Sequence, residues 1–276
     1  MALVLLAAVM HASWNAAVKA SRDPFQVTLL LVALGGVIAF IVARFLPLPA
    51  PASWPYLAAA GVLQVGYIAL LAKTLNTGDL SVGYPIIRGS GPLGAAILSA
   101  IFVGEALGLW AALGVASICV GIFSLALSGG VLRKGSTRPI ALAIGAGLLV
   151  AGYTVVDAVG VRISGEPISY ALWSFTLQGG PYAIYFLVWR RRQLAPLLRA
   201  HAVRATICAI AAGLTYVLVL WAFTRGAIAP IAALRESSVI VAAVIGAVFL
   251  HEPFGRRRVL AACLVAVGIV LLNLRG

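Results

Sequence analysis

Long apolar runs follow one another along the whole 276-residue chain, separated by short stretches of charged residues, proline and glycine. Runs such as LLLVALGGVIAFIVA (29–43) are apolar on every side, whereas the strands of a transmembrane barrel alternate apolar and polar positions. About 20 apolar residues suffice for a helix to cross the hydrocarbon core, so each run is predicted to be a spanning helix. Ten spans are predicted, at residues 2–19, 25–46, 54–73, 82–103, 107–128, 139–162, 168–189, 203–222, 228–249 and 257–274.

Composition supports lipid as the solvent of this chain. Hydrophobic residues make up 63% of it and charged residues 10%, with a mean hydropathy of +1.09. A soluble domain carries roughly a quarter charged residues, so this chain has too little polar surface for a water-exposed globule. A signal peptide would explain one apolar run near the start, but the runs recur to the end. The sequence therefore predicts an all-α polytopic membrane protein.

The net charge of +13 comes from Lys and Arg that lie mostly between the predicted spans. We expect anionic lipid headgroups of the bilayer, and no nucleic acid, as the partners of these charges. The gaps after odd-numbered spans hold 14 Lys and Arg, and the opposite side holds four. The positive-inside rule then places the rich side in the cytoplasm and both termini on the non-cytoplasmic side of the inner membrane.

Two phrases, AIFVGEALG (100–108) and AVFLHEPFG (247–255), indicate an internal duplication. A shift of 147 residues sets Arg88 on Arg235 and aligns these two phrases. The predicted domains are a first five-helix repeat at 1–130 and a second at 131–276. An odd number of spans per repeat inverts the second copy, as in many secondary transporters, so we expect inverted repeats around a central cavity. The arginines 256–258 then mark the cytoplasmic side of the second phrase.

Span four reads SVGYPIIRGSGPLG, with Tyr84 and Arg88 on one helical face. Pro85, Gly89, Gly91 and Pro92 are expected to break this helix, and broken backbone at membrane depth is tolerated where it lines a cavity. A guanidinium beside freed N–H groups suits a carboxylate or phosphate. The alternative is that Arg88 snorkels to the membrane interface.

Span nine reads PIAALRESSVIV and carries Arg235, Glu236 and Ser237. Adjacent helical residues point about 100° apart, so Arg235 and Glu236 are not expected to pair face to face. Pairing with Asp157 of span six or with Arg88 stays open. Glu236 is a candidate proton carrier, as is Asp157 in the apolar stretch YTVVDAVG, because ionisable groups inside membranes are commonly functional.

Span one carries His11, Trp14 and Asn15, of which His11 and Asn15 share a face. His11 is the third candidate for proton coupling, because histidine titrates near neutral pH. The alternative is a histidine satisfied by a neighbouring backbone carbonyl.

Aromatic residues with a polar tip form a further group, either an interfacial belt or a cavity lining. Tyr67, Tyr153 and Trp173 lie deep in their spans together with Gln178, which favours the cavity lining. Glu105 and Glu252 begin helices and are interpreted as structural. The predicted substrate-contacting and cavity-lining residues are His11, Trp14, Asn15, Tyr67, Tyr84, Arg88, Tyr153, Asp157, Trp173, Gln178, Tyr216, Arg235, Glu236 and Ser237.

No catalytic or metal-binding motif is recognised in the sequence. The three cysteines, Cys119, Cys208 and Cys263, are widely spaced and are interpreted as packing residues. We therefore expect no cofactor, no metal and no enzymatic activity.

Ten spans in two halves, each with a phrase of the kind F-x-GE-x-x-G before its last helix, resemble the drug/metabolite transporter superfamily. The copies at 72–127 and 219–274 look like paired EamA domains, and MHASWNAAVK looks like their usual first-helix start. The resemblance implies a metabolite exporter in which the first four helices of each half surround the cavity. Small multidrug members carry an essential Glu in their first helix, whereas this chain has His11 and Asn15 there, so their coupling is not carried over.

The sequence thus predicts a secondary transporter, an exporter of amino acids or similar small zwitterions that works by alternating access. Within the same class, export of cationic drugs or polyamines, or transport of phosphorylated sugars, remains open. An intramembrane enzyme and a structural membrane protein are the alternatives from other classes. A duplicated chain already contains both halves, so a monomer is sufficient.

Overall fold

The computed structural model describes residues 2–21, 23–77, 80–128, 137–241 and 256–274, and these form helices without any strand. Three helices precede the first gap: α1 (Ala2–Lys19), α2 (Pro24–Ala43) and α3 (Trp54–Thr77), the last entered through a short 3-10 turn at Pro51–Ser53. The others are α4 (Leu80–Phe102), α5 (Leu109–Ser128), α6 (Thr137–Ile163), α7 (Pro167–Val188), α8 (Arg191–Phe223), α9 (Ile228–Arg235) and α11 (Arg256–Asn273). The second phrase (247–255) with its Glu252, and residues 129–136, lie outside the described residues.

Local sequence explains where several helices begin. Asp23 caps α2 by accepting a hydrogen bond from the Gln26 amide at 3.0 Å, and Pro24 takes the first helical position. Pro167 starts α7 in the same way. Proline suits the first helical turn because its missing N–H would have no partner there.

The membrane character follows from the length and surface of the helices. Among the described residues, six segments are long and apolar enough to cross a bilayer: α1, α2, Pro51–Leu71, Gly83–Phe102 of α4, α6 and α8. Large apolar side chains such as Val62, Ile101 and Val203 are exposed on the outside, as expected where lipid is the solvent. The multi-pass helical fold is confirmed, whereas the number of ten spans remains a prediction.

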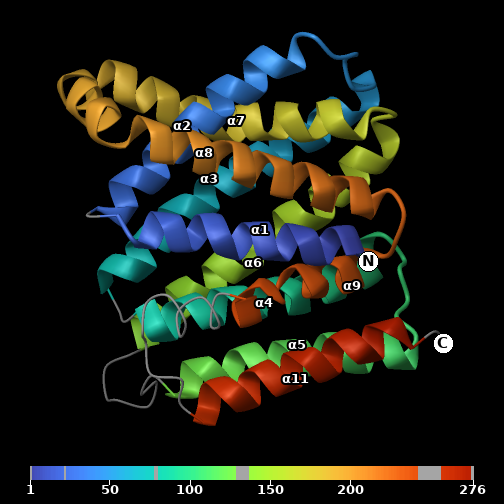
Figure 1. Cartoon of the computed structure of the whole chain (residues 1–276). Coiled ribbons are helices and arrows are strands. Elements are labelled where there is room, and N and C mark those ends of the chain that lie inside the picture. Colours follow the sequence, from blue (N-terminus) through green and yellow to red (C-terminus); the bar gives the residue numbers. More distant parts are fainter. Residues whose placement is uncertain (1, 22, 78–79, 129–136, 242–255, 275–276) are drawn as a thin grey trace.

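The helices lie side by side in a bundle, and those at its two edges come from different halves of the chain (Figure 1). At one edge α2 packs on α7, and at the other α5 packs on α11. Between them α6 packs on α3 and α4, and α1 packs on α8. The start of α1 and the end of α11 lie at the same end of the bundle (Figure 1).

Glycines allow the edge helices to approach closely. A Cβ on Gly114 would lie 2.9 Å from the Gly268 carbonyl oxygen, and a Cβ on Gly268 would lie 2.7 Å from that of Gly114. Further along, a Cβ on Gly121 would lie 3.0 Å from the carbonyl oxygen of Ala261. Residue numbers at these contacts rise along α5 while they fall along α11, so the two helices are antiparallel.

Two expectations about the helices are wrong. Residues 190–204 were expected to connect spans seven and eight, but α8 already begins at Arg191. Leu194, Leu197 and Leu198 pack on the cluster around Leu30 and Phe186, so burial of one apolar side holds this segment helical.

The break expected in span four occurs instead in span nine. Helix α4 runs without interruption through Pro85 and Pro92, because each proline removes only one backbone donor and packing supports the rest. Helix α9 ends at Arg235, and a turn at Glu236–Ser237 follows before helix resumes at 238–241.

Candidate functional site

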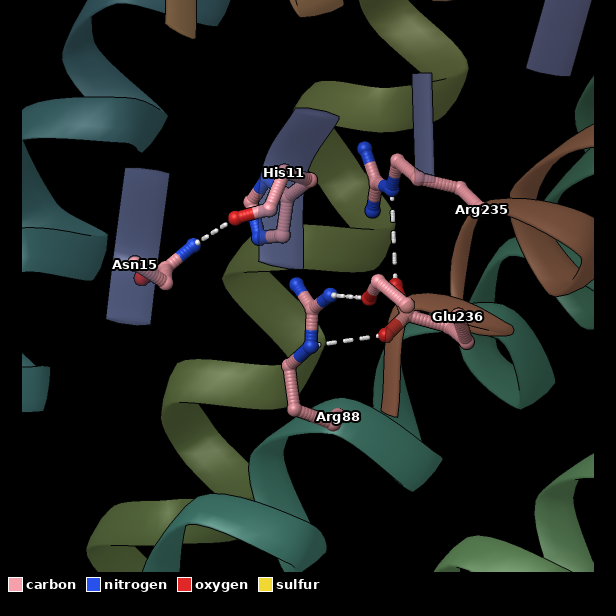
Figure 2. A network of polar contacts seen from close by, with 6 residues as sticks. His11, Asn15, Arg88, Arg235 and Glu236 are labelled. Atoms are coloured by element: carbon pink, nitrogen blue, oxygen red, sulfur yellow. Dashed lines mark hydrogen bonds and ion pairs between the residues drawn. The ribbon is translucent and has the colours of Figure 1, made fainter. Parts of the chain in front are cut away.

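A cluster of charged side chains joins α4 to the end of α9 inside the bundle (Figure 2). Arg88 Nε lies 2.7 Å from Glu236 Oε2, and the Arg88 Nη2 group donates a hydrogen bond to Ser238 Oγ at 3.0 Å. Arg235 Nε lies farther from the same carboxylate, 3.4 Å from Oε1. The side chain of Glu236 is 1% exposed and those of the two arginines are 10% exposed. We call these three residues the charged centre.

The geometry settles which partner Glu236 takes. The sequence left Asp157 and Arg88 open, and the structure pairs Glu236 with Arg88. The contact with Arg235 was not expected, and its 3.4 Å length agrees with the poor geometry of adjacent helical residues. Two guanidinium groups against one carboxylate leave the charged centre with a net charge of +1.

The turn after α9 explains how Glu236 and its neighbours are placed. The Glu236 amide donates a hydrogen bond to the Ala233 carbonyl, and the Ser237 amide donates one to the Leu234 carbonyl. Each bond spans three residues, as in a 3-10 helix, and together they end α9. Arg235 lies in the last turn of α9, where a positive charge is favourable beside the free carbonyls. Ser237 is 5% exposed beside this turn.

Helix α1 brings His11 next to the charged centre (Figure 2). The Asn15 side-chain amide donates to the His11 backbone carbonyl at 2.8 Å, so these two residues share a face as predicted. The His11 ring packs edge-on against Trp14 at 5.0 Å between centroids. Among the described residues the Trp14 indole nitrogen has no hydrogen-bond partner.

Asp157 lies in a separate group, which we call the aspartate network. Its Oδ2 accepts hydrogen bonds from Gln64 Nε2 at 2.9 Å and from the Tyr216 hydroxyl. Its Oδ1 accepts from the hydroxyls of Tyr170 at 3.2 Å and Ser174 at 3.4 Å. Asp157 is 1% exposed, and no arginine, lysine or histidine contacts it in the described part of the chain.

Sequence reasoning missed Gln64, Tyr170 and Ser174. A signal for them exists. Gln64 is a polar residue inside the apolar stretch AGVLQVGY, and Tyr170 and Ser174 are four residues apart, hence on one face of α7. Their contact with Asp157 depends on the packing of α3, α6, α7 and α8 against one another, which the sequence does not show.

Three predicted tyrosines lie near the charged centre. The rings of Tyr67 and Tyr153 are 6.0 Å apart, across the packing of α3 on α6. The Arg88 guanidinium carbon is 5.8 Å from the centroid of the Tyr84 ring, a distance at which a cation is attracted to an aromatic face.

The other predicted lining residues are placed differently. Trp173 packs against Phe40 at 5.9 Å and Trp54 at 5.3 Å, and it contacts neither polar group. Gln178 is half-buried on α7. Glu105 is structural as predicted, but it accepts from the amide of Ile228 at 2.7 Å and pairs with Arg162 at 2.7 Å. It therefore caps α9 rather than its own helix.

Within the described residues, His, Cys, Asp and Glu do not gather in a group that could hold a metal ion. The site is thus made of a charged centre, an aspartate network and tyrosines. Such a set can bind charged and polar small molecules inside the membrane.

The fold and these buried charges define a multi-pass helical membrane protein of the transporter type. Residues 1–127 and 137–274 each match the EamA-like transporter family, and the chain belongs to that family. This confirms the resemblance on which the sequence expectation rested. The chain is accordingly a multi-pass membrane protein of a transporter family.

Two further similarities support the fold and say little about the function. The chain is 44% identical over 70 residues to an uncharacterized protein, y4nH, of Sinorhizobium fredii (strain NBRC 101917 / NGR234). The match covers 25% of this chain and 60% of that relative. A solved structure described only as "Crystal structure of protein" aligns with a TM-score of 0.77 at 16% identity, over 99% of this chain and 97% of that one. At this identity the likeness concerns the fold alone.

Proposed function

We propose that the protein is a secondary active transporter that exports amino acids or similar small zwitterions across the inner membrane by alternating access. The observation that carries this proposal is the buried Arg88–Glu236 pair. Arg88 belongs to the first family match and Glu236 to the second. A contact that joins the two repeats at membrane depth is suited to exchange partners when the halves move against each other.

The inverted relation of the two halves is supported by the packing of α5 on α11. Ser117 Oγ donates to the Leu264 carbonyl at 2.8 Å, and these residues are themselves 147 positions apart. A residue that contacts its own repeat equivalent lies beside a twofold axis. Because α5 and α11 are equivalent helices and run antiparallel, this axis lies in the membrane plane, as inverted repeats require.

The charge of the site favours a substrate with a carboxylate. The excess of one guanidinium attracts an anionic group, and planar guanidinium forks bind carboxylates in two-point contacts. Arg235 is the better anchor, because among the described residues it reaches Glu236 through Nε alone, at 3.4 Å. Arg88 already holds Glu236 and Ser238. A carboxylate on Arg235 would free one oxygen of Glu236 for the substrate ammonium group.

The tyrosines supply the remaining contacts in this proposal. Tyr67, Tyr84 and Tyr153 present both ring faces and hydroxyls. They suit the apolar part of an amino acid. His11, Trp14, Asn15, Trp173, Gln178, Tyr216 and Ser237 are proposed to complete the cavity in one or another conformation.

Phosphorylated sugars are a second candidate, because two arginines near one another also suit a phosphate. Cationic drugs and polyamines are disfavoured by the net positive charge. Competition between substrate classes in one transport assay separates these candidates.

Counterflow in proteoliposomes tests the proposal. Vesicles loaded with unlabelled amino acid should accumulate the labelled one when they contain the wild-type protein. Arg235→Gln should abolish this accumulation, and Arg44→Gln, an exposed arginine outside the centre, should not. Full counterflow by Arg235→Gln and Glu236→Gln would rule out the charged centre as the substrate site.

A further inference from the structure

Asp157, the centre of the aspartate network, is not used by the substrate site proposed above, although it is 1% exposed and thus as deeply buried as Glu236. We propose that Asp157 is the proton-binding carboxyl of the transport cycle, and that the Tyr216 hydroxyl relays the proton to it. The inference rests on the proposed transport function and deepens it, because it assigns the coupling ion and its site.

The first argument is the lack of a counter-charge. Asp157 accepts four hydrogen bonds from neutral groups of α3, α7 and α8. An isolated ion buried in a protein is costly, and a carboxylate removes this cost by taking up a proton. The nearest charges on helices packed against α6 are Arg88, Arg235 and Glu236, which engage one another.

The other two coupling candidates fit the role less well. Glu236 holds two arginines, and neutralising it would leave both guanidinium groups buried without a counter-charge. His11 lies beside the same two arginines (Figure 2), where a third positive charge would add to their repulsion. Among the three candidates, Asp157 can change its charge without removing the counter-charge of these arginines or adding to their repulsion.

The network has no room for a metal ion in place of the proton. Gln64 Nε2 lies 2.9 Å from Asp157 Oδ2 and 2.8 Å from the Tyr216 oxygen, and the Ser174 and Tyr216 oxygens are 3.2 Å apart. The polar atoms are thus already in hydrogen-bond contact. A calcium or magnesium ion would need six or more oxygens around it at roughly 2.0–2.6 Å, whereas a proton needs no such space.

Gln64 can satisfy both protonation states. Its Nε2 faces Asp157, while its Oε1 is buried and has no partner among the described residues. A half-turn of the amide would present Oε1 as the acceptor for a protonated Asp157. The buried oxygen without a partner is the acceptor that the second state requires.

Tyr216 supplies the route. Asp157 is 1% exposed, but Tyr216 is half-buried and its hydroxyl donates to Asp157 Oδ2. The hydroxyl passes its own proton to Oδ2 and takes another from water when the transport cycle opens the network to one side of the membrane. One proton enters, the O–H bond of the tyrosine is restored, and the carboxylate becomes a neutral carboxyl group.

Flux driven by a pH gradient and counterflow at equal pH, measured in the same proteoliposomes, test the inference. For Asp157→Asn we expect counterflow to remain, while uptake driven by the gradient and proton movement triggered by substrate are lost. Tyr216→Phe should slow the gradient-driven flux, and Tyr182→Phe, a half-buried tyrosine of α7 outside the network, should leave it unchanged. Proton movement that persists in Asp157→Asn would overturn the proposal.

Infrared spectroscopy of the purified full chain gives a readout without substrate. The carboxyl C=O band that titrates with pH should shift in Tyr216→Phe and vanish in Asp157→Asn. A titrating band that neither variant alters would also overturn the proposal. Absence of counterflow with every metabolite, while this band behaves as expected, would instead contradict the transport function alone.

Discussion

Arg88 and Glu236 join the two repeats of the chain inside the bundle, where burying an unpaired charge costs free energy. The pair is 2.7 Å apart, with the carboxylate side chain 1% exposed. A buried ion pair contributes little net stability compared with apolar residues, but its loss on one side leaves an uncompensated charge. The two residues therefore join the halves, and in our proposal they tie substrate binding to that junction.

Arg88→Gln should lower the stability of the protein by about 3–5 kcal/mol, the cost of breaking a buried ion pair, because Glu236 is then left with the longer 3.4 Å contact to Arg235. Adding Glu236→Gln should recover none of this loss, because Arg235 is then buried without a counter-charge. Thermal unfolding in detergent measures both, with Arg44→Gln as the control. If Arg88→Gln unfolds at the wild-type temperature, the ion pair is not formed in the membrane.

A substitution at Gly160 tests the packing around Tyr170, a member of the aspartate network. A Cβ at this position would lie 2.2 Å from the Tyr170 hydroxyl and 2.7 Å from Tyr56 Cβ. Gly160→Ala should therefore lower stability by roughly 1–3 kcal/mol, as overpacking of a core does. Tyr170→Phe in the same chain should recover part of the loss. Gly213→Ala, where nothing lies within 4 Å, should not destabilise, and an equal loss at both glycines would contradict this packing.

Single residues were predictable to different degrees. Arg88, Glu236 and Asp157 stand out because a charge in an apolar run is rare, whatever the fold. Gln64 and Tyr170 do not stand out, since amides and tyrosines occur in spans for many reasons. Their importance depends on contacts between residues up to 152 positions apart, which a single sequence does not contain.

At the scale of helices, small residues decide where the chain packs most tightly. Gly36 of α2 and Gly179 of α7 meet so closely that a Cβ on Gly179 would lie 2.6 Å from Gly36 Cα. Close contacts between glycines also join α5 to α11. Without a hydrophobic drive between helices in lipid, close backbone approach supplies much of the association energy.

Gly268→Val should separate α5 from α11, because its Cβ would lie 2.5 Å from Ile118 Cγ1 and 2.7 Å from the Gly114 carbonyl oxygen. We expect a lower unfolding temperature and a more rapid cleavage of the second repeat by protease. Gly213→Val on the open face of α8 is the matched control for side-chain size. Equal behaviour of the two variants would show that these helices are not in contact.

The helices themselves were largely predictable from the apolar runs, while their interruptions were not. Proline and glycine in span four indicated a break, but packing keeps α4 continuous. In span nine the break at Glu236–Ser237 contains no proline or glycine, and Pro230 lies six residues before it inside continuous helix. Its position is set by tertiary contacts of Glu236, which local propensity does not report.

At the scale of the whole molecule, the side of the membrane on which each chain end lies tests the predicted topology. The start of α1 and the end of α11 lie at the same end of the bundle (Figure 1). The charge bias predicts that this end lies outside the cytoplasm. Tags at both termini should be reached by an impermeant reagent in intact cells, and a cysteine placed at Arg192 should not. Labelling of one terminus only would contradict an even number of spans and the inverted repeat.

The most direct test of a carboxylate-binding exporter compares pairs of compounds that differ only in that group. Each pair consists of an amino acid and the amine that remains when its carboxylate is removed, offered as competitors in the counterflow assay. The account predicts that the amino acids compete and that the amines do not, with the difference lost in Arg235→Gln. Equal competition by amines and amino acids in the wild-type protein would contradict it.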